Sequence, residues 1–122
     1  MITDAQWLGL VMRSEDDEPH AWWSLGWVVR NRLESPLYPD TYQDVIVQRR
    51  QFSYFVPFIG LSPQDVYAKA RQGYAGDATG WKANDLVAAE ACAAELIAAP
   101  RWKAPFSHRV MTFWAPAAMV PA

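Results

Sequence analysis

Residues 18–33 read EPHAWWSLGWVVRNRL, and the expected fold class follows largely from this stretch. Proline directly after Glu18 suits the first turn of a helix, where its missing N–H needs no partner. Apolar residues then occupy most sides of that helix, which is typical of a helix at the centre of a domain. Gly26 in its middle costs about 1 kcal/mol relative to alanine, so we expect a neighbouring element to approach closely there. The sequence therefore predicts a helical body built around residues 18–33.

The flanking segments carry further helix signals. Thr3 is a suitable N-cap for a first helix that runs through about residue 13. Thr41, with Asp44 three residues later, resembles a capping box at the start of a short helix. Two more helices are expected from their flanking serine, asparagine and proline residues, over residues 62–72 and 84–99.

Residues 51–58 show a period of two, because large side chains at positions 52, 54, 56 and 58 alternate with the rest. This pattern predicts an extended or hairpin-like segment. Residues 109–114 are also β-prone, and we expect them to pair with residues 51–58. The expected fold class is therefore α+β, mostly α, with a small β hairpin or sheet against the helical body.

Length and composition favour one domain over residues 1–122 and exclude several functions. The chain is 52% hydrophobic and carries a net charge of −2 without a basic run, so no nucleic-acid partner is expected. A single cysteine, Cys92, can form neither a disulfide framework nor a cysteine metal site. His20 and His108 lack the spacing of metal ligands, so we expect no metal and no cofactor. No apolar run approaches the roughly 20 residues that a membrane-spanning helix needs, so membrane insertion is not expected.

Glu15 is the strongest candidate for acid–base chemistry. Steps of four from Trp7 and Val11 place it on the apolar face, at the C-terminal end of the first helix. Partial burial, the negative end of the helix dipole and the acidic residues 16–18 all favour the protonated carboxyl. Such a glutamic acid is suited to protonating a glycosidic oxygen near neutral pH. The alternative is that residues 14–18 form a solvated acidic turn before the next helix.

Several short motifs occur in an order that resembles the cell wall hydrolases of the SleB type, a family of spore cortex-lytic enzymes and phage lysis proteins. The motifs are Ser14-Glu15, Glu18-Pro19, GWVVRNRL at 26–33, YPDT at 38–41, VIVQ at 45–48, QFS at 51–53 and the closing TFWAP at 112–116. The resemblance covers most of the chain, and residues 61–104 are its least diagnostic part.

This resemblance implies a lysozyme-like fold of the goose-type transglycosylase kind that cleaves peptidoglycan between N-acetylmuramic acid and N-acetylglucosamine. Glu15 matches the catalytic acid of the family, while Glu18 matches a second, supporting glutamate. Asn31 matches an asparagine that precedes arginine in the family, and we assign it a supporting role. Asp16-Asp17 replace the usual Ala-Arg-Gly between the two glutamates, so Glu18 stays the alternative acid.

Four residues are expected to bind the substrate. Gln51 and Ser53 share one face of the predicted extended segment, and both can hydrogen-bond a sugar hydroxyl or an N-acetyl group. Tyr54 is expected to line the floor of the cleft, and Trp114 to offer a stacking surface for a sugar ring. The alternatives are a polar hairpin edge for Gln51 and Ser53, and core packing for the aromatic residues.

No second carboxylate is marked by its surroundings, and a single acid suffices if the substrate supplies its own nucleophile. The resemblance therefore favours a lytic transglycosylase that leaves 1,6-anhydro-muramic ends over a hydrolase. A non-catalytic peptidoglycan-binding or interaction module that retains the fold is the alternative from another class. An amidase is not expected, because its usual zinc ligands are missing.

The N-terminus does not resemble a secretory signal, since no basic region precedes a long apolar one. We therefore expect synthesis in the cytoplasm and action in the periplasm or cell wall after release by another system. A phage lysin, a secreted antibacterial effector and a fragment of a longer protein all fit this expectation. An effector would require an immunity protein as its inhibitor, and a monomer is the expected state.

Overall fold

The computed structural model describes residues 1–16, 18–48, 52–58, 60–75 and 81–111. Helices account for all the regular structure of these residues. In chain order they are α1 (Asp4–Glu15), α2 (Pro19–Leu33), α3 (Tyr42–Val47), the 3-10 helix η1 (Ser53–Phe58), α4 (Pro63–Ala75), α5 (Trp81–Ala98) and the 3-10 helix η2 (Arg101–Lys103).

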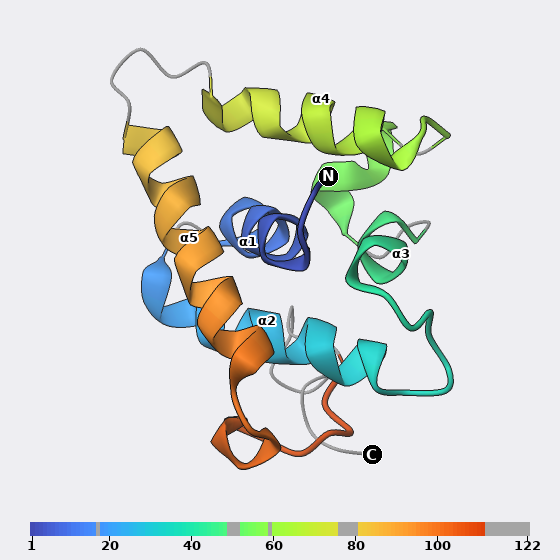
Figure 1. The fold of residues 1–122 in the computed structure, drawn as a ribbon, viewed down its shortest axis with the longest axis vertical. Coiled ribbons are helices and arrows are strands. Elements are labelled where there is room, and N and C mark those ends of the chain that lie inside the picture. The colour runs from blue at the N-terminus through green and yellow to red at the C-terminus, as the bar shows by residue number, and fades with distance from the viewer. Residues whose placement is uncertain (17, 49–51, 59, 76–80, 112–122) are drawn as a thin grey trace.

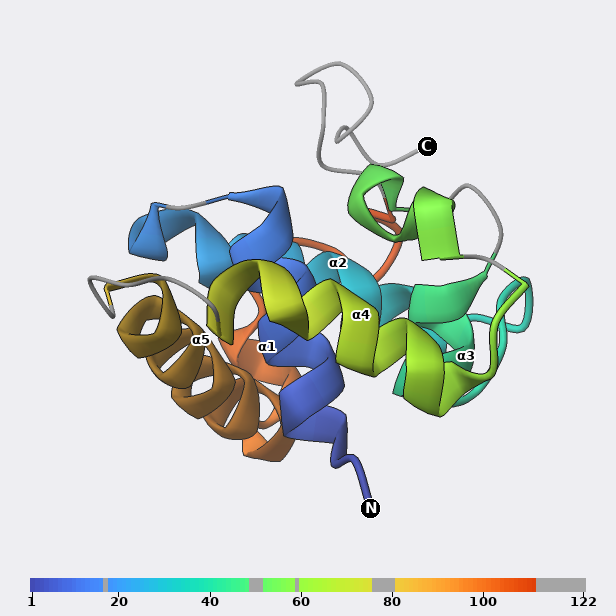
Figure 2. The same ribbon diagram turned by 90° about the horizontal axis from the view of Figure 1, so that it is seen from above.

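Helix α1 lies at the centre of the molecule. Figure 1 looks nearly along its axis, with α2, α3, α4 and α5 arranged around it, and all four helices contact it. Figure 2 shows α4 crossing over α1, with α3 and α5 on either side. All seven residues of the run 7–13 are buried, so α1 rather than residues 18–33 is the central helix. Helix α2 forms as predicted and contacts α1, α3 and α5.

The helix boundaries follow the capping signals of the sequence. Thr3 and Gln6 form a capping box, in which the Thr3 hydroxyl accepts from the Gln6 N–H at 3.1 Å and the Gln6 side chain accepts from the Thr3 N–H at 2.8 Å. The Thr41 hydroxyl accepts from the Asp44 N–H at 3.1 Å at the start of α3. Both predicted N-caps are therefore confirmed.

Two glycines allow α5 to pack closely against α1 and α2. A Cβ atom at Gly9 would lie 2.7 Å from the Cα of Glu90, and one at Gly26 would lie 2.5 Å from Cδ1 of Leu96. Both distances are too short for a side chain to fit without displacement. The close approach expected at Gly26 is thus confirmed, and the same contact at Gly9 brings α5 against the central helix.

The predicted β structure is wrong. No strand occurs among the described residues, and residues 53–58 form the 3-10 helix η1. The buried aromatic residues there are Phe52 and Phe55, which are spaced by three and joined by a hydrogen bond from the Phe55 N–H to the Phe52 carbonyl. This spacing matches the three residues per turn of a 3-10 helix. Residues 109–111 are not in a strand either, and the rest of the predicted partner, residues 112–114, lies outside the described part.

The fold is accordingly all-α over the residues that the structure describes. None of the helices described is long and apolar enough to cross a membrane.

Candidate active site

Glu15 is the last residue of α1, at the point where the chain leaves the core. Its carboxyl group is half-buried, and its Oε1 atom is buried without a hydrogen-bond partner among the described residues. This burial raises the pKa of the Glu15 carboxyl, and the positive charge of Arg32 opposes the rise only in part. Glu15 therefore keeps its proton to a higher pH than an ordinary glutamic acid does.

The raised pKa has a consequence for stability that Glu15→Gln would reveal. Because the pKa of Glu15 is higher in the folded protein than in the unfolded chain, where it is 4.5, proton binding stabilises the fold. This stabilisation is complete below pH 4.5 and is lost as the pH rises through the pKa of the folded state. Glutamine at this position does not titrate. We expect the melting temperature of wild type to fall relative to that of Glu15→Gln between pH 4.5 and pH 8. A difference that stays constant over this range would contradict the burial of the carboxyl.

The neighbouring acidic residues have different environments. Asp16 Oδ1 accepts from the Glu18 N–H at 2.8 Å, and the Asp16 carbonyl accepts from the indole N–H of Trp22 at 2.8 Å. The Glu18 side chain is 65% exposed and lies 3.7 Å from the imidazole Nδ1 of His20. This turn therefore leaves Glu18 open to water, whereas the last turn of α1 holds Glu15 partly inside.

Arg32 is a buried cation close to Glu15 that sequence reasoning did not single out. It is 4% exposed, and its Nε donates to the Met111 carbonyl at 2.8 Å. Its guanidinium carbon lies 5.4 Å from the ring centre of Tyr38 and 5.2 Å from that of Phe52. Burial lowers the pKa of Arg32, while Tyr38 and Glu15 raise it. Two local signals were available, namely an arginine on a helix that is apolar on most sides and its place after Asn31 in the GWVVRNRL motif.

Tyr54 is connected to the region of Glu15 by a second tyrosine, Tyr74. Its hydroxyl donates to the Ala70 carbonyl at 2.7 Å and hydrogen-bonds the hydroxyl of Tyr74, whose ring centre is 5.8 Å away. Burial raises the pKa of Tyr74 to about 12, and the charge of Glu15 contributes to that rise. The guanidinium of Arg13 lies over the Tyr74 ring at 5.1 Å. The C-terminal end of α1 is therefore bordered by tyrosines from η1 and α4.

Asn31 connects α2 to the segment that follows η2. It is fully buried, and its side-chain amide donates to the carbonyls of Ser107 at 3.1 Å and Val110 at 2.8 Å. Its oxygen accepts from Arg101. These bonds tie the segment after η2 to α2.

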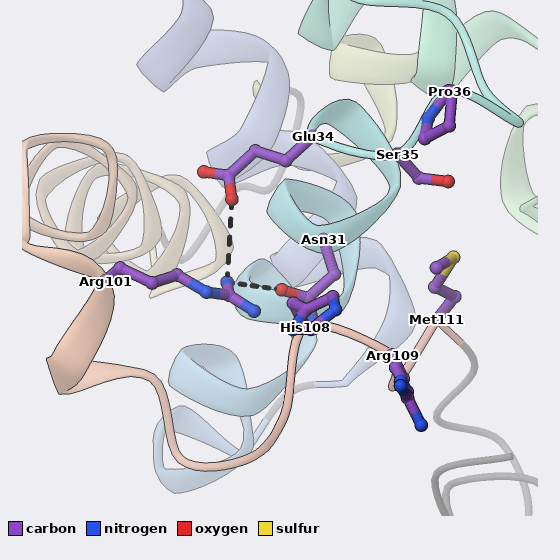
Figure 3. Close-up of a pocket in the computed structure, with 8 residues that line it drawn as sticks. All are labelled: Asn31, Glu34, Ser35, Pro36, Arg101, His108, Arg109 and Met111. Atoms are coloured by element: carbon purple, nitrogen blue, oxygen red, sulfur yellow. Dashed lines mark hydrogen bonds and ion pairs between the residues drawn. The ribbon is translucent and has the colours of Figure 1, made fainter.

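Asn31 also lines a pocket of about 380 Å³. In Figure 3 the Arg101 side chain reaches between Glu34 and Asn31, and His108 lies beside them. The pocket is separate from the carboxyl of Glu15, which is not among its lining residues. Met111 links the two, because it lines the pocket and accepts the hydrogen bond of Arg32.

The remaining predicted site residues cannot be placed. Gln51 and Trp114 lie outside the described residues, and so does the side chain of Ser53. Their substrate-binding roles stay predictions. Among the residues described, no group of three or more histidine, cysteine, aspartate or glutamate side chains could hold a metal ion.

The family model described as cell wall hydrolase matches residues 17–119, and the chain therefore belongs to this family. Family membership supports a peptidoglycan-degrading enzyme that acts on the cell wall. The matched range includes Glu18, Arg32 and Tyr54, and it begins two residues after Glu15. No curated protein and no solved structure matches the chain.

Proposed function

We propose that this chain cleaves the glycan strand of peptidoglycan between N-acetylmuramic acid and N-acetylglucosamine, with Glu15 as its general acid and base. The observation that carries the proposal is the contrast between the two candidate carboxyls. Glu15 has a buried, unpaired oxygen at the end of the central helix, whereas Glu18 lies open to solvent. A general acid needs a pKa near the working pH, and burial moves the carboxyl of Glu15 in that direction.

The reaction that we propose is that of a lytic transglycosylase of the lysozyme-like kind. Glu15 gives its proton to the glycosidic oxygen, and the bond between that oxygen and C1 of the muramic acid breaks. The Glu15 carboxylate then takes the proton of the C6 hydroxyl, whose oxygen bonds to C1 and closes a 1,6-anhydro ring. The enzyme returns to its starting protonation state without water being consumed.

The surroundings of Glu15 support a mechanism with one carboxyl. A glycosidase with two carboxylates holds the second one across the scissile bond. Of the described carboxyls nearby, Asp16 is held by the Glu18 N–H, and Asp85 lies 3.7 Å from Nε of Arg13. Neither is free to flank a sugar at Glu15, and Glu18 faces solvent.

The products of digestion test the reaction class. We expect purified peptidoglycan to yield muropeptides with 1,6-anhydro ends, lighter by one water than the corresponding reducing ends in mass spectrometry. Products with reducing ends alone would show hydrolysis and contradict the transglycosylase proposal.

A non-catalytic peptidoglycan-binding module is the second candidate function. It is favoured by the replacement of Ala-Arg-Gly by Asp16-Asp17 next to the proposed acid. Binding to purified sacculi without any loss of turbidity would support this candidate. Lysis by wild type that is lost in Glu15→Gln would exclude it.

Gly73→Ala tests whether Tyr54 takes part in the site. An added Cβ would lie 2.5 Å from the Tyr54 hydroxyl, so the ring must move and release its bond to Ala70. Alanine also favours a helix over glycine by about 1 kcal/mol, so the fold is retained. We expect a lower rate of lysis with circular dichroism like that of wild type. Ala68→Gly, at an exposed position of the same helix, is the control for helix propensity, and equal activity of Gly73→Ala and wild type would exclude Tyr54 from the site.

A further inference from the structure

Arg32 is a buried cation without an ion-pair partner among the residues that the structure describes. Three other described arginines do have a carboxylate within 4 Å. Arg13 pairs with Asp85, whereas Arg30 and Arg101 both pair with Glu34. No described carboxylate lies that close to Arg32, and its Nη1 atom is buried without a hydrogen-bond partner. A buried charge of this kind is costly unless an opposite charge lies nearby.

Glu15 is the group that can supply that opposite charge. It interacts electrostatically with Arg32, and its own Oε1 atom is buried and unpartnered. While the Glu15 carboxyl holds its proton, Arg32 has no carboxylate within 4 Å among the described residues. Once the proton has left, the Glu15 carboxylate supplies the negative counter-charge for the Arg32 guanidinium.

We propose that Arg32 is a positioning residue that stabilises the carboxylate formed when Glu15 gives its proton to the leaving oxygen. This inference rests on the proposed function. Arg32 is suited to the task because it is fixed in advance by its bond to the Met111 carbonyl and by the rings of Tyr38 and Phe52. A cation that need not reorient during proton transfer stabilises a developing charge more effectively than mobile water does.

The other described charged and titratable groups around Glu15 do not take over this role. From α4, Tyr74 has a pKa of about 12 and stays neutral in the range where Glu15 titrates. From η1, Tyr54 has a raised pKa because it is partly buried. On α1, Arg13 already has Asp85 of α5 within 3.7 Å, and Asp16 carries a charge of the wrong sign. Among the described residues, Arg32 of α2 is the cation whose charge acts on the Glu15 carboxyl.

The test compares neutral and charged side chains at position 32. Arg32→Met replaces the guanidinium with a long apolar side chain, and Arg32→Gln keeps a donor for the Met111 carbonyl. Both variants should lower kcat on sacculi at least tenfold, because the Glu15 carboxylate loses its cation. For the same reason the alkaline limb of the pH profile should move to higher pH. Arg32→Lys should restore the position of that limb and part of kcat.

Arg30→Met is the matched control, since Arg30 binds the Leu96 and Ala99 carbonyls instead. It should leave the position of the alkaline limb unchanged.

A second readout needs no substrate. The carbon-13 shift of the Glu15 carboxyl, followed against pH, should titrate at a higher midpoint in a folded Arg32→Met or Arg32→Gln protein than in wild type. An unmoved midpoint and an unmoved limb in either folded variant would overturn the inference. Lysis that persists in Glu15→Gln would instead overturn the proposed function. Loss of lysis in Glu15→Gln together with normal kinetics in Arg32→Met would sink the Arg32 inference alone.

Discussion

Glu15→Gln should lose lytic activity by roughly 10²–10⁴-fold, the usual contribution of a general acid, while its fold stays intact. Glutamine has nearly the shape of a protonated glutamic acid but cannot give up a proton. The measurement is the rate of turbidity loss of purified sacculi, with the melting temperature as the check on folding.

Glu18→Gln is the matched control for this prediction, because the same change is made three residues away at an exposed position. It should lyse sacculi nearly as fast as wild type does. The opposite pattern, with Glu18→Gln inactive and Glu15→Gln active, would make Glu18 the acid and reverse the assignment.

Gly9→Val should cost about 3 kcal/mol of stability, at the upper end of the range for overpacking. The new side chain would meet the backbone of Glu90 at 2.7 Å, and a backbone cannot rotate away as a side-chain tip can. For a chain of this length the cost corresponds to a fall in melting temperature of roughly 10 °C. Thermal unfolding followed by circular dichroism measures it.

Ala91→Val provides the comparison for Gly9→Val. It adds the same β-branched side chain to α5 at an exposed position, so it should lower the melting temperature only slightly. Equal melting temperatures for the two variants would show that α1 and α5 do not pack through Gly9.

The helices could be predicted because their signals are local. Thr3, Thr41 and Pro19 mark helix starts that the structure confirms. The identity of the central helix could not be predicted, because residues 7–13 include Gly9 and Arg13, which give no sign of burial. Gly9 is buried by the approach of α5, and Arg13 by Tyr74 and Asp85. Both contacts depend on segments more than 60 residues away in the sequence.

The hairpin was predicted wrongly because residues 51–58 satisfy two periods at once. The large side chains at even positions suggested a strand, whereas the burial of Phe52 and Phe55 follows a period of three. Only packing against α4, which contacts η1, distinguishes the two. Short aromatic-rich segments of this kind are ambiguous by pattern alone.

For the candidate site, the sequence predicted that Glu15 lies on the apolar face, and the structure places its carboxyl half inside the protein. It did not reveal Arg32, whose hydrogen bond to Met111 spans 79 residues. The roles of Glu15 and Arg32 stay predictions until variants are measured.

The pH titration of the Glu15 carboxyl carbon in the wild-type protein, read beside the pH profile of lysis, tests the central claim most directly. We expect a midpoint above the ordinary glutamate value and a fall in lytic rate as the pH rises through that same midpoint. A midpoint at or below the ordinary value, or a lytic rate that increases as Glu15 loses its proton, would contradict a buried glutamic acid as the proton donor.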